Sequence, residues 1–178
     1  NVHQMIKNIT KEDRLHLRKD GVKIGRYHIF LPRMLKPSAV ELRVKLWKLY
    51  FPEDKKYIIP KPGLNFLKNE TNKNNKFLLI CGFENFNNFY IRVDILERLF
   101  LKIIEKSKNG SFKIDSDMIN LIGCNKENFF KLLNLMEYKS KNKENEFFTY
   151  KPKQIKSKKF KEVDKNNPFE KLSELRFR

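Results

Sequence analysis

The chain has few of the residues on which most enzyme and metal sites are built. Its 178 residues include only 2 cysteines, 3 histidines and 6 glycines. Cys81 and Cys124 lie far apart and form no Cys-x-x-Cys pair, so we expect reduced, mostly buried thiols rather than a zinc site. The glycines never produce a phosphate-binding loop, and no His-Glu-x-x-His motif or paired nucleophile accompanies the histidines. We therefore predict no catalytic residue and no metal ligand within this chain.

Long apolar runs are also missing. No stretch approaches the 18 residues of a membrane span, and no secretory signal is visible. We therefore expect a soluble, cytoplasmic protein that does not enter a membrane. Because the chain begins with Asn1 rather than Met, we expect it to be an excerpt from a longer protein.

Basic residues, by contrast, are abundant in the chain. The formal net charge is +18 and the pI is about 9.9. Such a balance favours a polyanionic partner, with nucleic acid ahead of an anionic membrane surface. A second interpretation stays open, because lysine far outnumbers arginine and asparagine is frequent. An AT-biased genome would produce that excess without selection for binding, and the lysines would then form a solvated surface.

The most informative stretch runs from residue 110 to residue 150. Residues 115–122 predict a short helix that Gly123 ends, since glycine tolerates the left-handed conformation found at helix ends. Asn125 is expected to cap a second helix over residues 126–136. The apolar positions of that helix recur at helical spacing: Phe129, Leu132, Leu133 and Met136. Two short helices joined by a tight glycine turn are typical of proteins that lay a helix along a nucleic-acid groove.

The neighbouring segments extend this motif. A helix is predicted over residues 95–106, with Asp94 as cap, Glu97 completing a capping box, and a buried face formed by Leu96, Leu99, Phe100, Ile103 and Ile104. Residues 112–114 predict a short strand, and residues 138–140 and 147–150 predict the two strands of a lysine-rich hairpin. Helix, strand, helix, turn, helix and hairpin is the order of elements in a winged helix.

The fold class that follows is mainly α with a small β component. Residues 1–52 are predicted to form an N-terminal helical segment, with a helix from Thr10 to about Lys19, an extended segment at 27–31 and a helix over 39–50. In the 39–50 helix, Ser38 and Glu41 match a capping box. The expected buried stripe contains Ala39, Leu42, Leu46 and Leu49 and is widened by Val40 and Trp47. Residues 53–76 are interpreted as a linker or variable loop. Residues 77–150 are interpreted as a winged-helix-like domain, preceded by a small α/β segment. Residues 151–178 are expected to form a disordered basic arm that ends in a short amphipathic segment.

The candidate binding residues are polar positions on these predicted surfaces. The second helix of the motif and the hairpin contribute Lys126, Lys131, Asn134, Lys139, Lys141 and Lys143. A second basic cluster consists of Arg14, Arg18, Lys23, Arg26 and Arg33, of which the four arginines are the candidate binding residues. Lysines neutralise phosphates but lack the two-pronged geometry with which arginine reads guanine. The motif therefore indicates backbone grip rather than sequence readout. The alternative interpretation is that this helix packs on another domain and that its lysines are only solvated surface residues.

Several strings in a fixed order resemble a known family. They include Gly-Val-Lys-Ile-Gly-Arg at 21–26, Phe-Leu-Pro at 30–32, Leu-Lys-Pro at 35–37, Ile-Arg-Val-Asp-Ile-Leu-Glu-Arg at 91–98, Met-Ile-Asn-Leu-Ile-Gly-Cys at 118–124 and Asn-Pro-Phe at 167–169. The chain resembles the C-terminal region of alphaproteobacterial superfamily 2 ATP-dependent helicases, relatives of the mitochondrial RNA-degradation helicase. The likeness covers nearly the whole chain except about 53–76 and the lysine arm.

The resemblance implies a function that the chain does not carry alone. In such helicases two RecA-like lobes upstream of this region bind ATP and Mg²⁺ and hydrolyse ATP, and none of their motifs occurs here. The expected function is an accessory region that grips RNA or DNA beside those lobes, with a nuclease as a candidate further partner. Two alternatives stay open: a stand-alone winged-helix nucleic-acid-binding protein, and a protein-docking module.

Overall fold

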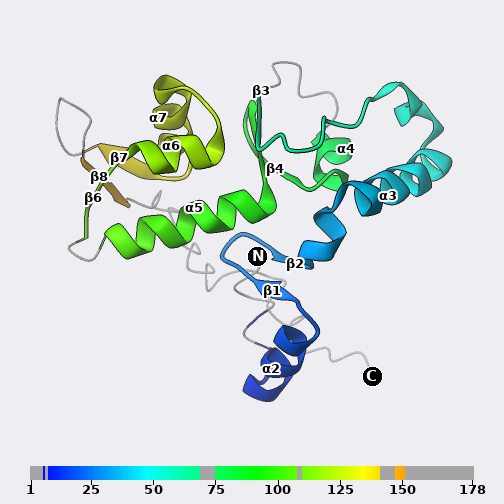
Figure 1. Cartoon of the computed structure of the whole chain (residues 1–178), viewed down its shortest axis with the longest axis horizontal. Helices are drawn as coiled ribbons and strands as arrows, with labels where there is room; N and C mark the ends of the chain where they lie inside the picture. The colour runs from blue at the N-terminus through cyan, green and yellow to red at the C-terminus, as the bar shows by residue number, and fades with distance from the viewer. Residues whose placement is uncertain (1–5, 7, 69–74, 108–109, 141–146, 151–178) are drawn as a thin grey trace, which may run out of the picture.

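The computed structural model describes residue 6 and residues 8–68, 75–107, 110–140 and 147–150 (Figure 1). Helices dominate these residues, and the strands form small antiparallel sheets, so the expectation of a mainly α protein with a small β component is confirmed. The candidate binding residues Lys141 and Lys143 lie outside the described residues, as does the predicted basic arm at 151–178.

The C-terminal part contains the elements expected between residues 93 and 150. They are α5 (Val93–Lys106), β6 (Phe112–Lys113), α6 (Ser116–Ile122), α7 (Lys126–Leu135), β7 (Tyr138–Ser140) and β8 (Phe147–Tyr150). Asp115 caps α6, Gly123 ends it with φ of 77°, and Asn125 caps α7 by accepting from the Asn128 amide at 2.9 Å. The predicted turn chemistry is confirmed. The three strands pair antiparallel in the order β6-β8-β7.

One hydrophobic core joins these elements. Its buried side chains come from all three helices and from the sheet, and they include Leu99, Ile103, Met118, Ile122, Phe112 and Phe148. The apolar face predicted for α7 is confirmed, because Phe129, Leu132, Leu133 and Met136 are all buried. The prediction for α5 is wrong at Ile104, which is 51% exposed. The predicted positions Leu96, Leu99 and Ile103 are buried, Phe100 is half-buried, and Ile95 is buried as well.

A second core lies beside the first. It is formed by α3 (Pro37–Tyr50), α4 (Asn75–Ile80) and the sheet β3-β5-β4, in which β3 (Phe66–Lys68) and β4 (Phe83–Phe86) flank β5 (Phe89–Arg92). β3 and most of the 3-10 helix η2 (Pro52–Lys56) fall inside residues 53–76, which the sequence indicated as a linker or variable loop. That interpretation missed β3. The three residues of this strand lie in a polar, proline-containing stretch, and only their pairing with β5 makes them a strand.

The boundaries and the buried face of α3 differ from the prediction. The helix begins at Pro37 and its N-cap Lys36 makes no side-chain cap, so the Ser38–Glu41 capping box does not form. Proline suits the first helical position because the amide it lacks would be unpaired there. The buried residues are Val40 and Val44, whereas Leu42, Leu46 and Leu49 are 60%, 59% and 75% exposed. The helix has two apolar faces, and α4 and the sheet cover the valine face.

The N-terminal part is a short helix followed by a hairpin. α2 (Lys11–Lys19) is capped by Thr10, whose hydroxyl accepts from the Asp13 amide at 3.1 Å, as expected. β1 (Lys23–Ile24) pairs with β2 (Ile29–Phe30) in a hairpin whose first strand was not anticipated. The turn η1 (Pro32–Leu35) then leads into α3. Figure 1 shows the hairpin running beneath α5, between α2 and the rest of the chain.

Candidate nucleic-acid interface

The exposed face of α7 carries the first set of predicted residues. Lys126, Lys131 and Asn134 are all exposed, whereas Phe129 and Leu132 of the same helix are buried. The Lys126 ammonium lies 5.7 Å from the centre of the Phe130 ring, a cation–π distance that leaves its charge at the surface. These three predicted binding residues therefore lie outside the core.

The hairpin adds one described lysine to this surface. Lys139 is exposed on β7, while its neighbour Tyr138 points into the core and packs edge-on against Phe112. Since successive strand residues face opposite sides, Lys139 lies on the outer side of the β6-β8-β7 sheet. The surface is not uniformly basic, because Glu127 is also exposed on α7. Phosphate contact there would depend on the individual lysines rather than on a large positive field.

The arginines of the second predicted cluster do not share a surface with the lysines of α7 and β7. Arg14 and Arg18 belong to α2, which lies on the other side of α5 from α7 (Figure 1). Arg14 is occupied locally, since its guanidinium donates to the carbonyl oxygens of Ile9 and Ile6 at 3.2 and 2.6 Å. Arg18 and Arg33 are exposed. Among these four arginines, Arg14 therefore has a structural role, which the sequence did not indicate.

Arg26 links the N-terminal hairpin to the C-terminal part. Its guanidinium carbon lies 4.6 Å from the centre of the Phe100 ring and 4.9 Å from that of Tyr150. Tyr27 packs edge-on against Phe86 and Phe100, and burial is the main reason that its phenol pKa is raised. Residues distant in sequence therefore meet in one aromatic cluster, with an exposed arginine at its edge.

Glu97 holds this loop in place. Its carboxylate accepts from the backbone amides of Arg26, Tyr27 and His28 at 2.8, 2.7 and 3.1 Å, and the residue is only 8% exposed. The predicted capping box at the start of α5 is therefore wrong: the helix begins at Val93 with Arg92 as N-cap, and Glu97 binds a distant backbone segment. The sequence offered one indication of this role, because Glu97 lies beside the apolar face of an amphipathic helix. His28 adds a contact to the Glu84 carboxylate, and this hydrogen bond raises the His28 pKa.

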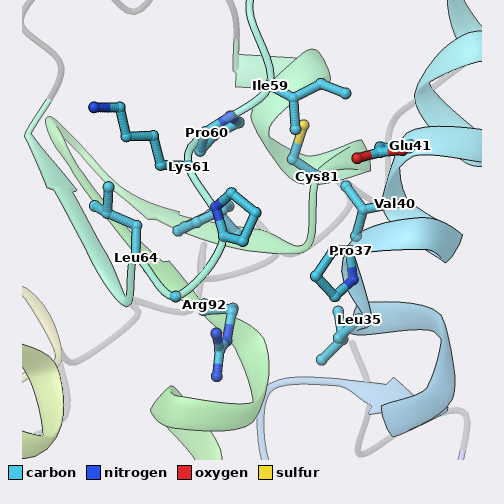
Figure 2. Close-up of a pocket in the computed structure, with 13 residues that line it drawn as sticks. Leu35, Pro37, Val40, Glu41, Ile59, Pro60, Lys61, Leu64, Cys81 and Arg92 are labelled. Carbon is cyan, nitrogen blue, oxygen red and sulfur yellow. The ribbon is translucent and has the colours of Figure 1, made fainter.

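Two hollows flank these elements. The first, of about 340 Å³, lies between the start of α3, the segment 59–64 and the β3-β5-β4 sheet, and Figure 2 shows prolines, Leu35 and the Cys81 sulfur around it. Its lining arginine, Arg92, makes two hydrogen bonds to Asp94 at 2.6 and 3.0 Å. The second, of about 410 Å³, lies between the β1–β2 hairpin and α5. Its lining combines apolar side chains with several cations.

Other candidate chemistry is sparse in the described part of the chain. There, no group of three or more His, Cys, Asp or Glu side chains comes together in a way that could hold a metal ion. Cys81 and Cys124 are free cysteines. None of the described helices is both long and apolar enough to cross a bilayer.

Comparisons of the chain with protein-family models, with curated proteins and with solved structures find no match.

Proposed function

We propose that this chain is the C-terminal accessory region of an ATP-dependent superfamily 2 helicase and grips RNA or DNA beside ATPase lobes that lie outside the chain. The observation that carries the nucleic-acid part is the combination of α5, α6 and α7 with the strand order β6-β8-β7. The helicase part rests on the family resemblance of the sequence.

The element order supports a winged helix. In such domains a helix that follows a tight turn lies along the nucleic acid, and a β-hairpin beside it contacts the backbone. α7 occupies that position in the order of elements, and Gly123 and Asn125 form the turn before it. β7 and β8 form the hairpin. The exposed positions of α7 and β7 include Lys126, Lys131 and Lys139.

The side chains on α7 favour backbone grip over base recognition. Its exposed face has lysines and Asn134 but no arginine. A lysine ammonium neutralises a phosphate as a point charge, whereas bidentate readout of guanine uses the arginine fork. The proposed region would hold a strand for a motor rather than select a sequence, and ATP and Mg²⁺ would act only in the upstream lobes.

The test is the double substitution Lys126→Glu plus Lys131→Glu, measured by fluorescence anisotropy with labelled RNA and DNA oligonucleotides at several salt concentrations. We expect affinity to fall by roughly tenfold or more and the salt dependence to become shallower, because phosphate contacts are lost. The matched control is Lys45→Glu plus Lys55→Glu, which changes the charge equally at exposed positions of α3 and η2. Equal affinity of the unaltered protein and the α7 variant would contradict the proposal.

A protein-docking module is the second candidate. One observation favours it: Leu42, Leu46 and Leu49 form an exposed apolar stripe on α3, and contiguous exposed apolar surface is typical of protein contacts. In that case nucleic-acid binding would be weak and would survive the α7 substitutions.

A further inference from the structure

The groove between the β1–β2 hairpin and α5 has the composition of a site for an anion with an apolar body. Its floor is apolar and aromatic, formed by Phe30, Phe100 and Leu101. Three exposed cations, Lys23, Arg26 and Arg98, line the same groove. Its volume of about 410 Å³ falls within the range of small-ligand pockets, roughly 300–1,000 Å³.

The two acids that line the groove are both engaged in hydrogen bonds within the fold. The Asp94 carboxylate is held by the Arg92 guanidinium through two hydrogen bonds of 2.6 and 3.0 Å. The Glu97 carboxylate accepts the three backbone amides of residues 26–28. Among the ion pairs of the described residues, none involves the three groove cations. With three cations against two acids, the groove lining carries a net positive charge, and its cations are free of the ion pairs seen among the described residues.

Arg26 is oriented before any ligand arrives. Its guanidinium carbon lies over the rings of Phe100 and Tyr150, 4.6 and 4.9 Å from their centres, and its backbone amide is fixed by Glu97. Stacking on aromatic faces leaves the N–H groups at the edge of the guanidinium plane free to bind phosphate oxygens. An arginine held in this way loses little side-chain entropy on binding, which favours recognition of an anion.

We infer that this groove binds one unpaired nucleotide unit of a single-stranded nucleic acid. The phosphate contacts Lys23, Arg26 and Arg98, and the base lies against the apolar floor at Phe30, Phe100 and Leu101. A base in a duplex has its faces covered by its neighbours, so only an unpaired base can use this floor. The inference rests on the proposed function and extends it, because it assigns single-strand contact to a surface separate from α7.

The test is Lys23→Glu plus Arg98→Glu, with binding measured on labelled single-stranded uridine and thymidine oligonucleotides and on a matching duplex. Single-strand affinity should fall by roughly tenfold or more, and the slope of log affinity against log salt should fall by about 0.7, the contribution of one neutralised phosphate on a single strand. Duplex affinity should change by less than about threefold. Equal losses on uridine and thymidine strands would show that the groove recognises the backbone chemistry common to RNA and DNA.

Three variants keep this result separate from the proposed function. The control Lys45→Glu plus Lys55→Glu should leave single-strand affinity unchanged, and thermal unfolding should show all variants folded. If the groove variant binds single strands like the unaltered protein while Lys126→Glu plus Lys131→Glu does not, the groove inference fails and the proposed function stands. If the unaltered protein binds no oligonucleotide, both fail. A groove variant that loses single-strand and duplex binding equally would also overturn single-strand selectivity.

Discussion

The carboxylate of Glu97 occupies the space that a side chain on Gly25 would need. A Cβ at position 25 would lie 2.2 Å from the Glu97 Cδ and 2.4 Å from both carboxylate oxygens. The same carboxylate accepts three amides from the residues that directly follow Gly25. Glu97 therefore anchors the backbone of the N-terminal hairpin on α5, beside the contacts of Arg26 and Tyr27 with Phe100, and the missing side chain of Gly25 allows the approach.

This relationship predicts a strong coupling between the two positions. Gly25→Ala should lower the free energy of unfolding by about 1–3 kcal/mol through steric overlap. Glu97→Ala should lower it by about 2 kcal/mol or more, because buried amides lose their acceptor. In the Glu97→Ala background, Gly25→Ala should cost well under about 1 kcal/mol, since the obstructing group is gone. Chemical denaturation of the four proteins measures the cycle, and additive costs would contradict the docking geometry.

The two apolar faces of α3 should respond differently to truncation. Val44→Ala should lower the free energy of unfolding by about 2 kcal/mol, because the side chain is buried against α4 and the sheet. Leu46→Ala, on the exposed face, should change it by no more than about 0.5 kcal/mol. Urea denaturation compares them directly. Equal costs would show that the leucine face is covered within the folded chain.

His28 should make stability depend on pH in one direction. Its pKa is raised above the usual 6.5, chiefly by the hydrogen bond to Glu84, so the imidazolium form stabilises the fold. That contribution is fully present below about pH 6.5 and is lost as the pH rises through the raised pKa of the folded state. The stability difference between the unaltered protein and Glu84→Gln should therefore shrink as the pH rises from 6 toward 9. A difference that is constant across this interval, in denaturation at each pH, would exclude the pair as a source of stability.

The two thiols should be slow to react while the protein is folded. Burial raises the pKa of both Cys81 and Cys124 to about 11, so only about one thousandth of each is thiolate at pH 8. Alkylation by iodoacetamide, followed by mass spectrometry, should be roughly a hundredfold slower than in the urea-unfolded chain. Rapid labelling of folded protein at either cysteine would contradict the burial.

Gly123 should be sensitive to a side chain for conformational rather than steric reasons. It has φ of +77°, and a Cβ there would meet no atom within 4 Å. Gly123→Ala should therefore cost about 1 kcal/mol from the left-handed backbone alone, and Gly123→Asn should cost less because asparagine tolerates that region. Thermal unfolding distinguishes them. A neutral alanine substitution would mean that the turn can relax.

Local patterns in the C-terminal part were sufficient to predict its elements. Asp115, Gly123 and Asn125 act on backbone groups within three or four residues, so their effect can be anticipated without knowing the rest of the fold. The burial of Phe129 and Leu132 followed from a single apolar stripe on α7. Where a helix offered two stripes, as in α3, periodicity could not indicate which one other elements would cover.

The candidate site was predictable in part. Exposure of Lys126, Lys131, Asn134 and Lys139 agrees with their being polar positions outside the apolar pattern of α7 and the hairpin. The groove was not predictable as a site, because Lys23 and Arg98 are 75 positions apart in the numbering and belong to different elements. The role of Glu97 was misassigned for the same reason: its spacing suited a local cap, while its partners lie about 70 residues earlier.

The chain by itself determined where α6 ends and α7 begins, which face of α7 is buried and how strongly basic the protein is. These properties depend on backbone capping, on helical period and on composition, which are local or additive quantities. Tertiary structure alone decided that the leucines of α3 face outward, that Glu97 anchors the hairpin and that three cations gather over an apolar floor. Those outcomes depend on which distant segments pack together, and packing is settled by the competition among all apolar surfaces of the folded chain.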